Sequence, residues 1–402
     1  MKVAIVHDWL DSYAGSERVL EQLLEIWPEA DLFALCDFLP ESERAFLRGR
    51  PVRTSFIQRL PLARRGFRRY LGLMPLAVEQ FDLSGYGLVV SSSHAVAKGV
   101  LTGPGQLHVS YVHSPMRYAW DLQHQYLRQA GLEGGLKGAY TRWLLHRMRL
   151  WDRASAAGVD VIVANSAYIA ERIRKVWRRE AQVVHPPVDL EGFEPRRRKE
   201  GHYLITSRMV PYKRVELVVE AFRRMPERRL VVVGDGPGRP LVLAAAAGAP
   251  NIEFRGRVEQ CELVRLTQTA RAFVFAAEED FGIAMVEAQA CGTPVIAFRR
   301  GGARDIVRAP PLPEPTGLLF PEQTAESVMA AVERFEALAV PIQPEHCRRN
   351  ALRFGRERFR AAMHDLVEEH LAEQGQGQGQ QQDGGHAILP HRRHARAKSG
   401  AL

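Results

Sequence analysis

Short apolar runs alternate with amphipathic segments along most of the chain. Residues 3–6 form one such run, and the apolar residues of 17–27 then recur at helical spacing. Further apolar runs at 88–90, 108–113 and 159–164 predict buried strands. Buried strands that alternate with amphipathic helices predict a parallel sheet covered by helices on both faces.

The alternation is interrupted at 183–189 and then resumes. Two adjacent prolines, Pro186 and Pro187, disfavour both a helix and a central strand, so this segment is expected to link two domains. Ligands of doubly wound sheets bind beyond the carboxyl ends of the strands, which places the expected site in the cleft between the two halves. The strand candidates of the second half, each followed by a helix candidate, are 203–206, 230–233, 252–254, 273–276 and 295–297.

The expected domain boundaries follow from this pattern. It predicts an α/β protein with two Rossmann-like, doubly wound domains, over 1–185 and 201–343, joined by a linker over 186–200. Residues 344–373 are expected to form helices that pack back on the first domain. Residues 374–402 are rich in Gln, Gly, His and Arg, and this low-complexity segment is expected to be disordered.

Composition narrows the class of protein. With 402 residues, of which 46% are hydrophobic and 25% charged, the chain suits two or three globular domains and neither a disordered nor a fibrous protein. The four cysteines, Cys36, Cys261, Cys291 and Cys347, are too scattered for a disulfide framework or a zinc site. Since no long apolar run or signal-peptide core is found, we expect a cytoplasmic protein, which can still lie on the inner face of the plasma membrane.

The net charge of +9, from 55 basic and 46 acidic residues, favours an anionic partner or reflects an arginine-rich composition. A nucleic acid is disfavoured as this partner, because no recognisable binding module is present and the basic residues are dispersed. Arginines between 53 and 69 lie among apolar residues between 56 and 71. Such a basic amphipathic surface suits an anionic membrane, the alternative being a half-buried helix with solvated arginines.

The densest cluster of candidate chemistry lies at 279–294. Glu279 follows a strand candidate, and Gly282 permits a sharp entry into a helix. Glu287 lies about one and a half helical turns further on and is expected to project into the cleft. The free N–H groups at the start of this helix can bind a diphosphate, and both carboxylates can accept hydrogen bonds from sugar or ribose hydroxyls. The alternative is a helix whose first-turn acids only offset its dipole.

Other segments that follow strand candidates carry candidate ligand contacts. Arg208 and Lys213 flank a turn that contains proline and can converge on one anion, or they are simply solvated. His113 lies among aromatic and charged residues that suit a carbohydrate, unless it is a structural histidine. Gly15 follows the first strand, where the backbone can approach a phosphate or form a plain turn. The glycine loop 234–238 resembles a dinucleotide fingerprint but lacks its spacing.

Several of these segments together resemble one enzyme family. The string 279–287 resembles the E-x7-E motif of the family-4 retaining glycosyltransferases, which have the GT-B fold of two Rossmann-like domains facing across a cleft. The resemblance covers essentially 1–370, and its other segments are 186–189, 207–213, 234–237 and 316–320. Segments similar to a WbaZ-like bacterial subgroup of O-antigen and exopolysaccharide mannosyltransferases are 7–10, 91–94 and 113–118.

The resemblance implies that the second domain binds a nucleotide-sugar donor. Arg208 and Lys213 would hold the donor diphosphate, and Glu287 would hold the ribose. The backbone near Val258 would meet the base. Glu279 would lie beside the transferred sugar.

The resemblance also places residues of the first, acceptor-side domain at the donor. His113 would contact the transferred sugar, and Gly15 would approach the phosphates. The family often has a Gly-Gly pair where this chain has Ala14 and Gly15, which alters the loop. The remaining backbone contacts would come from Phe281, Gly282 and Ile283. The implied catalytic residues are His113, Arg208, Lys213 and Glu279.

The implied reaction is the transfer of a sugar with retention, with mannose from GDP-mannose as the first choice. The acceptor would be a polyprenyl-diphosphate-linked or other saccharide in the synthesis of a cell-surface polysaccharide such as O-antigen. No cofactor and no metal are expected, because no Asp-x-Asp pair occurs and the basic residues and a helix N-terminus would neutralise the leaving diphosphate. The alternatives are a UDP-sugar donor, a nucleotide-sugar epimerase and a non-catalytic sugar-nucleotide binder.

Overall fold

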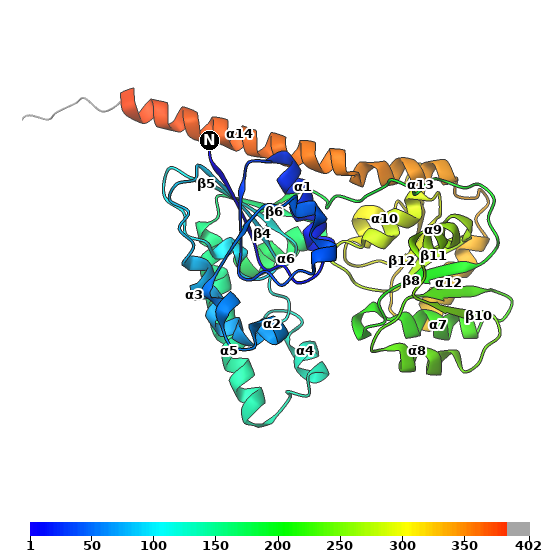
Figure 1. Ribbon diagram of the computed structural model, residues 1–402. Helices are drawn as coiled ribbons and strands as arrows, with labels where there is room; N and C mark the ends of the chain where they lie inside the picture. The colour runs from blue at the N-terminus through cyan, green and yellow to red at the C-terminus, as the bar shows by residue number, and fades with distance from the viewer. Residues whose placement is uncertain (384–402) are drawn as a thin grey trace, which may run out of the picture.

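Two parallel β-sheets, one in each half of the chain, form the framework of the molecule (Figure 1). The computed structural model describes residues 1–383. The first sheet has the strand order β3-β2-β1-β4-β5-β6-β7 and the second β10-β9-β8-β11-β12-β13. The strands are β1 (Val3–His7), β2 (Asp31–Ala34), β3 (Val52–Thr54), β4 (Leu88–Ser93), β5 (Leu107–Val112), β6 (Val161–Ala164), β7 (Gln182–Val183), β8 (Tyr203–Thr206), β9 (Leu230–Val233), β10 (Ile252–Gly256), β11 (Ala272–Phe275), β12 (Val295–Phe298) and β13 (Gly317–Phe320).

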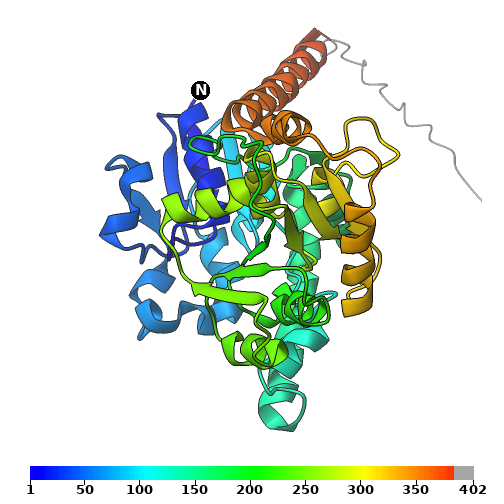
Figure 2. The ribbon, with the colours of Figure 1, turned by 90° about the vertical axis from the view of Figure 1, so that its right-hand side faces the viewer.

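Helices cover both faces of each sheet, as the alternating pattern predicts (Figure 2). The helices of the first domain are α1 (Gly15–Ile26), α2 (Ala63–Gly66), α3 (Met74–Glu79), α4 (Gln123–Gln129), α5 (Gly135–Ser155) and α6 (Ala167–Trp177). Those that follow are α7 (Val215–Arg223), α8 (Arg239–Ala246), α9 (Gln260–Thr269), α10 (Ile283–Ala290), α11 (Ala303–Ile306), α12 (Ala325–Glu336), α13 (Pro344–Ala351) and α14 (Arg356–Asp383).

The period of two along the strands sorts their side chains into two cores per sheet. In β1, Ile5 belongs to the core beneath α1 and α14, whereas Ala4 and Val6 belong to the core beneath α3 and α5. All three side chains are fully buried. A strand with both faces buried carries apolar residues at successive positions, which explains the short apolar runs of the sequence.

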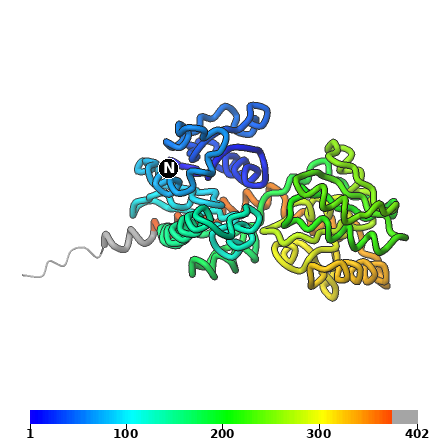
Figure 3. Tube along the Cα trace, turned by 90° about the horizontal axis from the view of Figure 1, so that it is seen from below, coloured from blue at the N-terminus to red at the C-terminus, as the bar shows by residue number. Residues whose placement is uncertain are grey.

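Two segments run side by side between the domains, which appear as separate lobes from below (Figure 3). Val188, in the linker, pairs with Gly355 as an isolated parallel bridge, and its N–H donates to the carbonyl oxygen of Phe354 at 2.8 Å. Helix α14 starts from this crossing and returns to the first domain, where Phe359 and Met363 pack into the core beneath α1.

Helix α14 extends further than the sequence indicates. It continues to Asp383, so residues 374–383 are helical where we expected disorder. Glutamine is a good helix former, and a helix already nucleated and packed near its start extends without a new nucleation step. The rest of the segment expected to be disordered lies outside the described residues. Within residues 1–383, no helix is long and apolar enough to span a bilayer.

Candidate active site

The carboxyl ends of the two sheets face each other across a cleft of about 690 Å³. Its walls come from the loops that follow β1, β4 and β5 in the first domain and β8 and β11 in the second. This volume lies within the usual range of small-molecule sites. The predicted residues that line the cleft are Gly15, His113, Arg208, Lys213, Glu279, Phe281, Gly282 and Ile283.

Two predicted residues lie outside the lining of the cleft. The carboxylate of Glu287, on α10, faces α1 of the first domain instead, where Arg18 Nη1 lies 3.4 Å from Glu287 Oε1. Burial raises the pKa of Glu287, and the nearby charge of Arg18 opposes this shift. Val258 is half-buried and packs on the apolar core of the second domain. Glu287 thus faces the other domain beside the cleft, and its predicted contact with the ribose stays a prediction.

The loop that carries Glu279 is held by glycines. Gly282 has φ +105°, and a Cβ on it would lie 2.4 Å from Met285 Cε. The N–H of Gly302 donates to the carbonyl oxygen of Glu279 at 2.8 Å, and a Cβ on Gly301 would lie 2.1 Å from that same oxygen. Only glycine permits these approaches, so the loop after β12 fixes the backbone of Glu279.

The loop that carries Arg208 is held in the same way. The N–H of Met209 donates to the carbonyl oxygen of Asp235 at 2.9 Å. A Cβ on Gly234 would lie 2.0 Å from the carbonyl oxygen of Ser207. The glycine loop that resembles a dinucleotide fingerprint thus supports the neighbouring loop, and Arg208 stays exposed at the mouth of the cleft.

Lys213 and Glu279 form an ion pair inside the cleft between Nζ and Oε1. Both side chains are largely buried. Burial and the positive charge of Arg117 lower the pKa of Lys213 to about 8. An anionic ligand that reaches Lys213 would therefore compete with Glu279 for the ammonium group and stabilise its charge.

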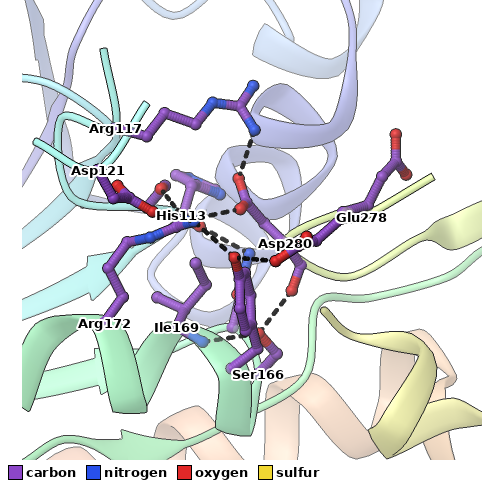
Figure 4. Close-up of polar contacts among 12 residues, drawn as sticks. His113, Arg117, Asp121, Ser166, Ile169, Arg172, Glu278 and Asp280 are labelled. Carbon is purple, nitrogen blue, oxygen red and sulfur yellow. Dashed lines mark hydrogen bonds and ion pairs between the residues drawn. The ribbon is translucent and has the colours of Figure 1, made fainter. Parts of the chain in front are cut away.

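A polar network joins the two domains beside this pair (Figure 4). The carboxylate of Asp280 accepts hydrogen bonds from Arg117 Nη1 at 3.1 Å and from Arg172 Nη1 at 3.0 Å. The hydroxyl of Ser166, the N-cap of α6, donates to the carbonyl oxygen of Asp280 at 2.5 Å. Because Asp280 follows Glu279 directly, this network holds the Glu279 loop against the first domain.

Sequence reasoning missed Arg172 and Ser166. A signal was available for Ser166, which follows strand β6 and caps a helix, as residues at ligand-facing loops of such sheets do. Arg172 lies within α6 and carries no local signal.

The first-domain wall of the cleft is also built from strand ends. His113 follows β5, and Asn165 Nδ2 donates to its carbonyl oxygen at 2.9 Å. Burial, with the neighbouring imidazoles of His94 and His7, lowers the pKa of His113 to about 3, so the ring is neutral. Asp8 shapes the wall indirectly, because its carboxylate accepts hydrogen bonds from the backbone N–H groups of residues 94–97 at 2.6–2.9 Å.

Within the part of the chain that the structure describes, no group of three His, Cys, Asp or Glu side chains is arranged to hold a metal ion.

Comparison with known proteins adds the family context. The family model described as "Glycosyltransferase Family 4" matches residues 13–191, and that described as "Glycosyl transferases group 1" matches 191–354. A D-inositol 3-phosphate glycosyltransferase of Mycobacterium marinum is 27% identical over 252 residues, which are 51% of this chain and 53% of that protein.

Two further proteins are similar. A GDP-mannose-dependent monoacylated alpha-(1-6)-phosphatidylinositol monomannoside mannosyltransferase of Corynebacterium glutamicum is 30% identical over 178 residues, 37% of this chain and 47% of that protein. The chain thus spans about half the length of the curated relatives it matches. The structure of the lipopolysaccharide outer core galactosyltransferase WaaB superposes with a TM-score of 0.64 at 16% identity, over 92% of this chain and 100% of that one.

Proposed function

From the premise that the chain belongs to glycosyltransferase family 4 and has the GT-B fold, we propose that it transfers a sugar from a nucleotide diphosphate to an acceptor hydroxyl with retention of configuration. The observation that carries this proposal is the convergence of Arg208, Lys213 and Glu279 in one cleft between the two domains. A largely buried lysine with a lowered pKa in a cleft is typical of a functional site.

The chemistry of the donor explains the basic residues. When the bond between the anomeric carbon and the diphosphate oxygen breaks, negative charge builds on the diphosphate. Arg208, Lys213 and the free N–H groups at the start of α10 would stabilise that charge more strongly in the transition state than in the bound donor. Neither a cofactor nor a metal ion enters this scheme.

Retention is proposed to occur by attack on the face that the leaving group departs from. The acceptor oxygen forms its bond to the anomeric carbon as the bond to the diphosphate breaks. The hydroxyl proton of the acceptor moves to an oxygen of the departing diphosphate. Glu279 would position the transferred sugar from the second domain and His113 from the first.

GDP-mannose is the proposed donor. The name of the corynebacterial relative states that it is GDP-mannose-dependent, which supports this choice. A UDP-sugar is the second candidate, because the base would meet mainly backbone near Val258, and backbone groups select weakly between guanine and uracil.

We also propose that the acceptor is presented on an anionic membrane. Leu62, Leu73 and Leu76 are 61%, 42% and 51% exposed on the short helical segment 56–79. Other apolar residues of this segment, Ile57 and Phe67, are buried in the core of the first domain, whereas these three leucines are left on the surface. The exposed leucines share the surface with exposed arginines, which favours attraction to anionic lipid. These arginines are Arg64, Arg65 and Arg69.

Flotation with liposomes tests the membrane surface. We expect the protein to float with vesicles that contain anionic lipid and not with neutral vesicles, and a Leu62→Ser, Leu76→Ser double variant to lose flotation. Equal flotation on neutral vesicles would contradict the electrostatic part of this proposal.

A transfer assay tests the proposed reaction. GDP-mannose and UDP-glucose are each incubated with polyprenyl-diphosphate-linked saccharides, and the anomeric configuration of any product is determined by NMR. We expect an α-mannosyl product from GDP-mannose. A β-mannosyl product would contradict retention, and epimerised nucleotide sugar formed without acceptor would favour the epimerase.

A further inference from the structure

A continuous chain of hydrogen bonds crosses the carboxyl ends of three adjacent strands and ends at His113. Oε1 of Glu17, on α1, lies 3.3 Å from Nε2 of His7, on β1. Nδ1 of His7 lies 3.1 Å from Oγ of Ser92 on β4, and this oxygen lies 2.8 Å from Nε2 of His113 after β5. The side chains of Glu17, His7 and Ser92 are almost completely buried.

The carboxylate of Glu17, at the inner end of this series of hydrogen bonds, fixes the position of the hydrogen on Nε2 of His7. Its other oxygen, Oε2, accepts the backbone N–H of Ala14 at 2.9 Å and the hydroxyl of Ser16 at 3.0 Å. Although burial opposes the shift, the hydrogen bonds that Glu17 accepts from His7 and from the N–H of Ala14 lower its pKa below the usual range. Glu17 is therefore an ionised acceptor, and Nε2 of His7 must carry a hydrogen that points to it.

Whether His7 is neutral or charged decides which way the next hydrogen points. Two other donors already stabilise the charge of Glu17, and the side chain of His7 is buried beside the ring of His94. With Nε2 protonated, Nδ1 of a neutral His7 is an acceptor and takes the single hydroxyl hydrogen of Ser92. The oxygen of Ser92 can then only accept from His113.

The opposite nitrogen of His113 is consequently left without a hydrogen. Nε2 of His113 donates to Ser92, so Nδ1 of this neutral ring is a bare acceptor. Among residues 1–383 this nitrogen has no hydrogen-bond partner, and the His113 side chain lines the cleft.

We propose that Glu17, His7 and Ser92 are positioning residues that fix His113 as the Nε2–H tautomer, so that its Nδ1 accepts a hydrogen bond from a hydroxyl of the transferred sugar. The second half of this statement rests on the proposed function. It makes one hydroxyl of the sugar obligatory as a hydrogen-bond donor. A donor with fluorine or hydrogen at that carbon leaves the nitrogen unpaired and binds less well.

The competing explanation is that Glu17, His7 and Ser92 only stabilise the fold. Strand β4, which carries Ser92, also offers a matched control. One residue earlier, the hydroxyl of Ser91 lies 2.9 Å from Nε2 of His108, and both residues are buried. This pair has the same chemistry as Ser92 and His113, but it is fully buried and lies away from the cleft. Ser91→Ala therefore removes an equivalent hydrogen bond without touching His113.

The tautomer is observed directly by NMR on protein labelled with ¹⁵N in its histidines, without any substrate. Long-range ¹H–¹⁵N correlations at neutral pH distinguish the two ring nitrogens, and the signals of His113 are those lost in His113→Gln. We expect Nε2 of His113 to be protonated and Nδ1 to be bare in the wild type, a mixture in Ser92→Ala, and the wild-type pattern in Ser91→Ala. A protonated Nδ1 in the wild type, as a charged His7 would impose, overturns the proposal whatever the Ser92 and Ser91 variants show.

Kinetics test the second half. We expect Ser92→Ala to lower kcat/KM for GDP-mannose about tenfold, the effect of one weakened hydrogen bond, and Ser91→Ala to leave it within twofold. In donors with fluorine in place of one sugar hydroxyl, replacement at one position should lower kcat/KM strongly in the wild type and only weakly in Ser92→Ala. Equal discrimination in both overturns the sugar contact. If no nucleotide sugar binds at all, the proposed function fails, whereas the NMR result still decides the tautomer.

Discussion

The contact between Arg172 and Asp280 offers the sharpest test of how the cleft is organised. The guanidinium of Arg172 is 7% exposed and donates through Nη1 to Asp280 Oδ1 in the other domain at 3.0 Å. Through Nη2 it donates to Asp121 Oδ2 in its own domain, also at 3.0 Å. One buried cation thus has a partner on each side of the cleft, and only one of the two contacts bears on domain closure.

The expected loss of kcat/KM follows from the free energy of a hydrogen bond between charged groups. A hydrogen bond between charged groups contributes about 1.5–3 kcal/mol, and burial on the arginine side places this one well above an exposed ion pair. Since about 1.4 kcal/mol corresponds to tenfold in rate, losing the contact should lower kcat/KM for the donor about 10- to 150-fold. Arg117 still contacts Asp280 at 3.1 Å and limits the loss.

A double-mutant cycle isolates this contribution from general damage. Arg172→Met, Asp280→Asn and the double variant are compared by kcat/KM for the nucleotide sugar and by thermal unfolding. Asp121→Asn is the matched control, because it removes the partner of Arg172 that does not cross the cleft, and it should leave kcat/KM unchanged. A coupling energy below about 0.5 kcal/mol between Arg172 and Asp280, in variants that remain folded, would refute a role of this contact in closing the cleft.

Three further results are expected. Glu279→Ala should lower turnover about 10²- to 10³-fold, as loss of a group that supports the transition state does, in a variant that stays folded, and a wild-type rate would remove Glu279 from the site. Transfer should persist in excess EDTA, because Arg208 and Lys213 take the part of a metal; an absolute need for added divalent cation contradicts this. The pKa of Lys213 of about 8 means that its charge is present below that pH and lost above it, so kcat/KM should fall as pH rises above 8. Lys213→Arg should abolish this alkaline limb, and its persistence would assign the limb to another group.

The sequence predicts the framework well because burial leaves a local trace. Parallel strands covered on both faces, such as β9 (Leu230–Val233) and β12 (Val295–Phe298), are built from consecutive apolar residues, and these runs are visible in the sequence. The edge strands β3 (Val52–Thr54) and β7 (Gln182–Val183) leave no such trace, because they are short and largely exposed. Their pairing is decided by the neighbouring strand and not by their own residues.

For the candidate site, too, the sequence predicts some features and not others. Loops that follow strands end at the same edge of a sheet, so Gly15, His113 and Glu279 could be placed in one cleft from their positions alone. The contacts that orient these residues come from far along the chain: Arg172 and Asp280 are 108 positions apart. Helical spacing gave the position of Glu287 on α10 but not its neighbour Arg18, which comes from the other domain.

The proposed reaction requires that the cleft bind the diphosphate of a nucleotide sugar through Arg208 and Lys213. Isothermal titration of the full chain with GDP, UDP, GDP-mannose and UDP-glucose, without metal, measures this binding. We expect selective binding of GDP and GDP-mannose that is abolished by Arg208→Ala. Selective binding of UDP would preserve the reaction and overturn the donor, whereas binding of no nucleotide, or binding that survives in Arg208→Ala, would contradict the proposed reaction itself.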